Sequence, residues 1–193
     1  MLRRPFFPVS LNLEGRVCVV IGSAEDREAV EKATALTEAG ATVRRLYDPE
    51  AVSETDLGDV FFVISTPQDE KLSARLRQWA ERGKFLLCCI DQPKYGFVAM
   101  AAIAKAGPVR VAISTAGLAP RVAKILKMAL QRAMDRKFER FVEHLASSRV
   151  RTRAEHPGPE DSPIRRRAMI DAARGFEATV EFAYPPWFEE SDG

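Results

Sequence analysis

The chain has 193 residues, 46% hydrophobic and 29% charged, which is enough to bury the core of one domain with a smaller companion. Its 29 basic and 27 acidic residues leave a net charge of +2, which argues against a nucleic-acid-binding protein. No apolar run reaches the roughly 18 residues of a membrane span, and the start lacks the apolar segment of a signal peptide. We therefore expect a cytoplasmic protein.

The first apolar run, from Arg16 to Gly22, is continuous, as in a parallel strand that is covered on both faces. Small and apolar residues then recur at helical spacing until Gly40, and residues 41–46 return to strand character. Together they form a βαβ unit of about thirty residues. Such a unit is typical of a nucleotide-binding half-domain.

The loop between this strand and helix would have to hold a cofactor phosphate through Gly22, Ser23 and Ala24. A dinucleotide fingerprint needs several glycines for a tight turn and a close approach to pyrophosphate, and only Gly22 is present. Glu25 and Asp26 suit the dipole of the helix N-terminus but would repel a pyrophosphate placed there. A cofactor site and a purely structural turn both remain open.

Further buried strands are predicted over residues 59–65 and 84–90, with an amphipathic helix over 69–82 between them. Residues 49–58 are too few for another complete βα unit. Ligands of open α/β sheets lie outside the carboxyl ends of the strands. Asp48, Thr66 and Asp91 each follow a predicted strand and are therefore candidates.

These candidates differ in the chemistry that they offer. Asp48 could meet a ribose hydroxyl, or it could form a turn before Pro49. Asp91 could act as a general acid or base at the functional rim, or it could be a turn carboxylate before Pro93. The three cysteines lie in predicted strands without metal-ligand spacing, and the two histidines have no ligating neighbours, so we expect no metal site.

Residues 108–124 read as a short strand (109–113) that closes the sheet, a turn of small residues, and a helix that begins at Pro120. Proline is tolerated in the first turn of a helix because its missing N–H would have no partner there. The free N–H groups of this junction could receive an anionic group, or the junction could only connect two elements. The turn comprises Ser114, Thr115, Ala116 and Gly117.

The helix after Pro120 is predicted to be about 26 residues, or roughly 40 Å, long. It would therefore extend beyond one small domain. We expect a second copy of the chain to cover its overhang, unless the C-terminal helix folds back over it. Cations near its start, Arg121 and Lys124 among them, form either a solvated face or a site for a polycarboxylate. Residues 146–163 read as a linker, and a helix is predicted over 164–178.

The order of these elements resembles the precorrin-2 dehydrogenase family, which includes the N-terminal half of siroheme synthase. The similar motifs are FPVSLNLEGRVCVVIG, EAGATV, FFVISTPQDEKLSARL, IDQP and VAISTAGLAPRVAKILK, and the basic run Arg165-Arg166-Arg167 is similar as well. The resemblance implies an α/β fold with a shortened Rossmann-like, NAD-binding domain in residues 1–113. A helix for dimerisation and the tetrapyrrole cleft would follow in 114–146, and a helical region in 147–193, in a homodimer.

The resemblance also implies NAD-dependent oxidation of precorrin-2 to sirohydrochlorin, followed in some members by iron insertion. The essential aspartate of the family falls on Asp91, and the cofactor side on Gly22, Ser23, Ala24, Asp48 and Thr66. The tetrapyrrole side falls on Ser114, Thr115, Ala116, Gly117, Pro120, Arg121 and Lys124. Because the triple-glycine loop of the family is replaced, a chelatase or tetrapyrrole-binding protein without NAD is the alternative. A structural dimer without a small-molecule site is a third hypothesis.

Overall fold

The computed structural model describes residues 6–189. The chain forms two compact units. The first comprises the residues up to Ala104 together with Val111–Ala129, and the second comprises Lys105–Arg110 and the chain from Leu130 onward. Within the described residues, no helix is long and apolar enough to cross a membrane.

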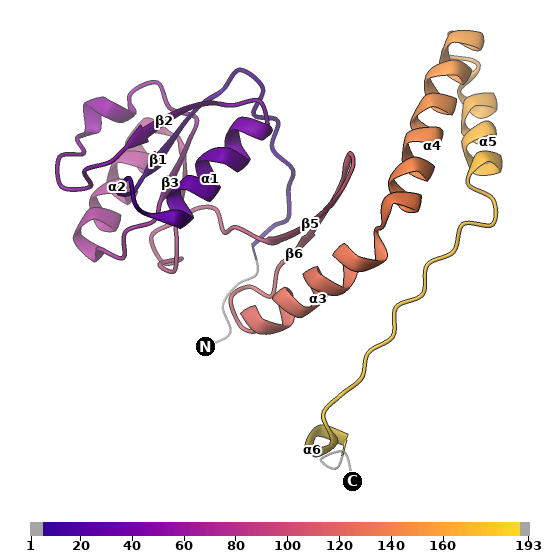
Figure 1. Ribbon diagram of the computed structural model, residues 1–193. Coiled ribbons are helices and arrows are strands. Elements are labelled where there is room, and N and C mark those ends of the chain that lie inside the picture. Colours follow the sequence, from indigo (N-terminus) through magenta and orange to yellow (C-terminus); the bar gives the residue numbers. More distant parts are fainter. Residues whose placement is uncertain (1–5, 190–193) are drawn as a thin grey trace. The chain divides into compact units, whose positions relative to one another are not determined.

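The first unit is built on a four-stranded parallel sheet, in the order β2-β1-β3-β4. Figure 1 labels β1, β2 and β3 of this sheet. The strands are β1 (Val17–Ile21), β2 (Thr42–Leu46), β3 (Phe62–Ser65) and β4 (Leu86–Cys89). Every residue of β3 is buried, as the continuous apolar run in the sequence predicted. The predicted α/β fold with a Rossmann-like sheet is therefore confirmed.

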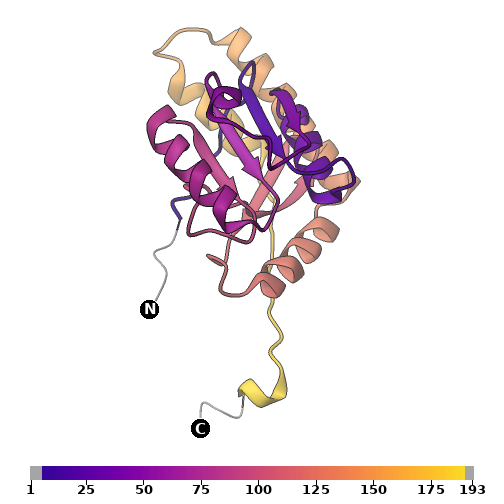
Figure 2. The ribbon, with the colours of Figure 1, turned by 90° about the vertical axis from the view of Figure 1, so that its left-hand side faces the viewer.

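Two helices, α1 (Arg27–Glu38) and α2 (Glu70–Gly83), cover opposite faces of this sheet (Figure 2). Side chains alternate between the faces along each strand. Leu72 and Leu76 of α2 pack with Val19, Ile21, Val63 and Leu87, whereas Ala29 and Leu36 of α1 pack with Cys18, Val20, Phe62 and Ile64. The connection between β2 and β3 holds only a 3₁₀-helix, η1 (Glu54–Leu57), which fits the prediction that no complete βα unit lies there.

Lys84, directly after α2, has a left-handed backbone with φ 58°, and its N–H donates to the carbonyl of Ala80. Glycine adopts this conformation without the Cβ clash. We expect Lys84→Gly to raise the free energy of unfolding by about 1 kcal/mol, measured by urea denaturation. Gln78→Gly, in the exposed middle of the same helix, should instead lower it by about 1 kcal/mol. Equal effects of the two substitutions would contradict this explanation.

The prediction that residues 109–113 close the parallel sheet is wrong. β5 (Ala102–Ala106) and β6 (Val109–Ile113) form a separate two-stranded sheet. Only Gly107 and Pro108 connect them, and so short a connection permits an antiparallel hairpin but no parallel crossover. Gly107 has φ 51°, as a turn of this kind requires.

The predicted single helix of about 26 residues is also wrong, because α3 (Pro120–Ala133) ends and α4 (Arg136–Glu155) begins anew. Asp135 has extended backbone angles, and its carboxylate accepts a hydrogen bond from the N–H of Phe138 at 2.9 Å, so it caps α4. α4 also continues through much of the predicted linker.

The region after α4 is helical over a shorter stretch than predicted. α5 (Ser162–Ala172) packs against α4 and ends before the predicted boundary at residue 178, and α6 (Pro186–Glu189) lies near the end of the described chain. The ring of Phe176 stacks on Phe141 at 5.0 Å between centroids. The C-terminal region thus folds back over α4, as one of the two sequence hypotheses expected.

Candidate functional site

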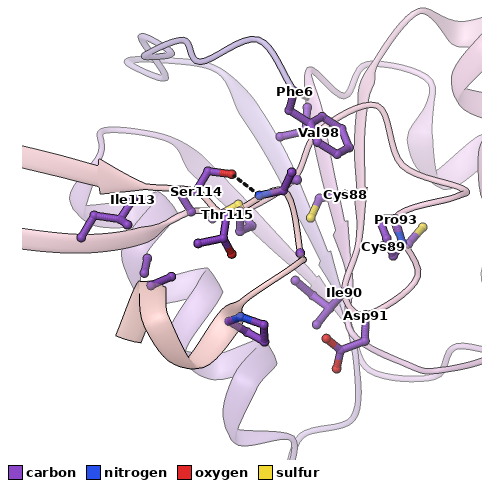
Figure 3. Close-up of a pocket in the computed structure, with 18 of the residues that line it drawn as sticks. Phe6, Cys88, Cys89, Ile90, Asp91, Pro93, Val98, Ile113, Ser114 and Thr115 are labelled. Atoms are coloured by element: carbon purple, nitrogen blue, oxygen red, sulfur yellow. Dashed lines mark hydrogen bonds between the residues drawn. The ribbon is translucent and has the colours of Figure 1, made fainter. Parts of the chain in front are cut away.

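A cavity of about 350 Å³ in the first unit brings together residues from the end of β4 and from the junction before α3. Its volume is in the range of small-molecule sites. Figure 3 shows Asp91 and Ile90 on one side of this cavity and Ser114 and Thr115 across from them. Ala116, Gly117, Pro120 and Ala123 also line the cavity.

Asp91 lies two residues beyond β4, at the carboxyl edge of the sheet, where the sequence placed it. It has a left-handed backbone with φ 56°, and its exposed carboxylate lines the cavity. The side chain of Gln68, which follows β3, donates a hydrogen bond to Asp91 Oδ2 at 3.2 Å. Neighbouring strands therefore supply a carboxylate and an amide that holds it, and the sequence did not indicate this role of Gln68.

The Ser114–Gly117 turn is held by its own side chains. The Ser114 hydroxyl accepts a hydrogen bond from the N–H of Ala116 at 3.3 Å, the dashed line in Figure 3. The Thr115 hydroxyl accepts one from the N–H of Ala119 at 3.3 Å. Both hydroxyls act as acceptors in these bonds, so their own hydrogens can still be donated to a ligand in the cavity.

The sequence missed two cavity residues on α1, Glu28 and Lys32, which form an ion pair at 3.4 Å. Their spacing of four residues on a helix could have indicated a shared face. The predicted cations Arg121 and Lys124 are not among the residues that line the cavity, although Pro120 and Ala123 beside them are. The cation at the cavity is therefore Lys32, and its ion pair with Glu28 places a negative charge beside it.

The cysteines are free and buried, as predicted. Cys88 also lines the cavity, and burial, with a smaller effect of Cys89, raises the pKa of its thiol to about 11. The thiol is therefore neutral near pH 7 and unsuited to act as a nucleophile. Among residues 6–189 there is also no group of three or more His, Cys, Asp or Glu that could hold a metal ion.

The second unit contains a cavity of its own, of about 450 Å³, between α4 and α5. It is lined by Arg149, Arg153, Arg165 and Arg166, with Thr152, Ser162, Met169 and Ile170. Two residues of the basic run noted in the sequence, Arg165 and Arg166, thus face this cavity.

Of the predicted cofactor residues, Gly22 and Thr66 lie beside Asp26 at the start of α1. The Asp26 carboxylate accepts hydrogen bonds from the N–H groups of Glu28 at 2.9 Å and Ala29 at 3.2 Å, and one from the hydroxyl of Thr66. Asp48, by contrast, accepts from the N–H groups of its own turn, at Glu50 and Ala51, which is the turn-forming alternative. The capped loop does not fit a pyrophosphate at this helix N-terminus.

The hydroxyl of Thr66 lowers the pKa of Asp26 below its usual value, and the N–H groups and the charge of Arg45 act in the same direction. A lowered folded-state pKa stabilises the protein above the unfolded value of about 4, and this stabilisation is lost as the pH falls through the folded pKa. We expect the free energy of unfolding at neutral pH to be higher for wild type than for Asp26→Asn. This difference between the two proteins should become smaller below about pH 4. Urea denaturation of both proteins at several pH values measures this difference, and a difference that does not change with pH would contradict the prediction.

Comparisons with known proteins agree with this architecture. Residues 9–102 match the protein family described as "Putative NAD(P)-binding". The siroheme synthase of Hahella chejuensis is 27% identical over 168 aligned positions, which cover 77% of this chain and 35% of that protein. The siroheme synthase of Ectopseudomonas mendocina is 32% identical over 143 positions, covering 65% of this chain and 30% of that protein. The chain thus spans about a third of the length of these curated relatives.

A solved structure described as "SirC, precorrin-2 dehydrogenase" has the same fold, with a TM-score of 0.66 at 20% identity. The match covers 88% of this chain and 90% of that one. The parallel sheet and the helices after it are therefore shared along almost the whole chain. The sequence matches, for their part, show that the chain is homologous to the N-terminal part of siroheme synthase.

Proposed function

We propose that this protein acts in siroheme biosynthesis on a tetrapyrrole intermediate, precorrin-2 or sirohydrochlorin, that binds at the Asp91 cavity. The observation that carries the proposal is that Asp91 and the Ser114–Gly117 turn, distant in sequence, line one cavity. A tetrapyrrole with its carboxylate side chains is larger than this cavity. We therefore expect one edge of the macrocycle to enter it.

In this proposal Asp91 accepts protons from the bound tetrapyrrole and passes them to solvent: one in the oxidation, where the accompanying hydride goes to NAD, and two, in turn, when a divalent metal ion replaces the two pyrrole protons. A carboxylate within hydrogen-bond reach of the leaving proton can act as a general base. Gln68 orients the carboxylate through its hydrogen bond. The ammonium group of Lys32, which pairs with Glu28 in the free protein, would exchange this partner for a carboxylate of the substrate. The hydroxyls of Ser114 and Thr115 can donate to polar groups at the edge of the macrocycle.

Two kinds of function are consistent with this site, one with a dinucleotide and one without. NAD-dependent oxidation of precorrin-2, with NAD as hydride acceptor, is the activity that the sequence predicted first. Insertion of a metal ion into sirohydrochlorin, or binding of the tetrapyrrole alone, needs no dinucleotide. We favour the second possibility because Asp26 already caps the N-terminus at which the NAD pyrophosphate would bind.

The predicted domains and homodimer stay part of the proposal. Residues 1–113 would form the Rossmann-like domain, 114–146 the dimerisation and cleft region, and 147–193 the C-terminal helical region. Apolar side chains before and along α3 are exposed in the single chain, and a second copy could cover them. These are Leu118, Val122, Ile125 and Met128, each at least half exposed.

Two assays on the purified protein test the proposed function. One adds iron to sirohydrochlorin and follows the absorbance of siroheme; the other adds NAD to precorrin-2 and follows the absorbance of sirohydrochlorin. We expect the protein to accelerate metal insertion or, failing that, to bind sirohydrochlorin tightly. If the protein binds neither tetrapyrrole and accelerates neither reaction, the proposal is wrong. The structural dimer without a small-molecule site would then be the remaining hypothesis.

A further inference from the structure

The N-terminus of α1 is the place where a nucleotide-binding βαβ unit holds the pyrophosphate of its cofactor, through N–H groups that have no partner in the helix. In this chain Asp26 Oδ1 accepts hydrogen bonds from two of these groups, the N–H of Glu28 and the N–H of Ala29. A carboxylate of the protein therefore occupies two of the N–H donors that this helix N-terminus offers to a phosphate.

Thr66, at the end of β3, fixes this carboxylate from the side of the sheet. Its hydroxyl donates to Asp26 Oδ2 and lies 3.1 Å from the carbonyl oxygen of Ile21. Thr66 is itself buried and Asp26 is partly buried, so this contact is partly shielded from solvent. Asp26 cannot swing away from the helix without giving up this hydrogen bond as well as the two at the helix end.

The loop between β1 and α1 is closed on its other side by Arg45 of β2. The guanidinium group of Arg45 donates to the carbonyls of Gly22 at 3.2 Å and Ser23 at 2.9 Å. There is also no free space beside Gly22: a Cβ placed there would lie 2.8 Å from the Cβ of Ala29 and 2.9 Å from Asp26 Oδ2. Because Gly22 has no side chain, Ala29 and Asp26 can pack closely against it, and they leave no room for a phosphate there.

We infer that this chain binds no dinucleotide at the N-terminus of α1, because the Asp26 carboxylate takes the place of the cofactor pyrophosphate. The helix dipole and the two N–H groups favour one anion, and a second anion beside Asp26 would be repelled. The tetrapyrrole cavity is thus retained in a fold whose dinucleotide site is closed by its own side chain.

Calorimetric titration of the full chain with NAD, NADP and inorganic pyrophosphate tests this inference. The variant Asp26→Gly removes the carboxylate at a position where glycine is a tolerated cap, and Asp26→Ser keeps a capping oxygen without the charge. Asp69→Gly is the matched control, because Asp69 caps α2 in the same way, accepting from the N–H groups of Lys71 at 2.7 Å and Leu72 at 3.2 Å.

We expect no saturable binding of NAD or NADP by wild type or Asp69→Gly, and at least about tenfold tighter binding of pyrophosphate by the two Asp26 variants. Micromolar binding of NAD by wild type would overturn the inference. So would folded Asp26 variants that bind pyrophosphate no better than Asp69→Gly. Because this titration contains no tetrapyrrole, a result against the inference would not count against the proposed substrate. A negative result in the tetrapyrrole assays would, in turn, not count against the closed dinucleotide site.

Discussion

Replacing Asp91 by asparagine is expected to slow tetrapyrrole conversion by about 10²- to 10⁴-fold, the range that a positioned acid or base contributes. Asparagine keeps the size of the side chain and can still pair with Gln68, but it cannot accept a proton. Affinity for sirohydrochlorin should change much less than the rate, because the rest of the cavity is intact. Single-turnover measurement of siroheme formation, with a parallel binding titration, separates these two effects.

Asp48→Asn provides the matched control for this substitution. Asp48 also follows a strand of the sheet and lies close to a proline, but it caps its own turn and does not line the cavity. We expect its variant to retain the wild-type rate. If Asp91→Asn kept a rate within a few-fold of wild type, Asp91 would not be the proton acceptor.

The substitution with the largest expected effect on stability is Leu87→Ala, in the strand that leads to Asp91. Leu87 is fully buried, and its carbonyl accepts hydrogen bonds from the N–H groups of Phe97 at 2.8 Å and Val98 at 3.0 Å. Truncation removes apolar contacts and leaves a cavity that the rigid sheet fills only in part. We expect the free energy of unfolding to fall by about 2–5 kcal/mol, measured by urea denaturation.

Leu118→Ala is the control for Leu87→Ala. The side chain of Leu118 is 67% exposed in the single chain, so its truncation should change the unfolding free energy by less than about 0.5 kcal/mol under dilute conditions. A loss of similar size in both variants would contradict the assigned core.

The sheet and the position of Asp91 could be predicted from the sequence because both depend on local patterns. Continuous apolar runs give parallel strands that are buried on both faces, and the residue after such a strand lies at the carboxyl edge. The Ser114–Gly117 turn was found in the same way, from small residues followed by Pro120.

Other features depend on contacts between distant segments, which periodicity does not reveal. The apolar pattern continues across Asp135. The start of α4 is shown only by the structure, through the extended backbone of Asp135 and the hydrogen bond that its carboxylate accepts from the N–H of Phe138. The pairing of Asp26 with Thr66 joins residues forty positions apart. Lys32 faces the cavity because of the way α1 packs on the sheet, which the sequence left open.

The most direct test of the proposed site is a titration of the labelled protein with sirohydrochlorin, followed by the amide resonances in NMR spectra. We predict saturable binding, with the largest shifts at Asp91 and at the Ser114–Gly117 turn. The absence of binding, or shifts confined to residues away from this cavity, would contradict the proposal.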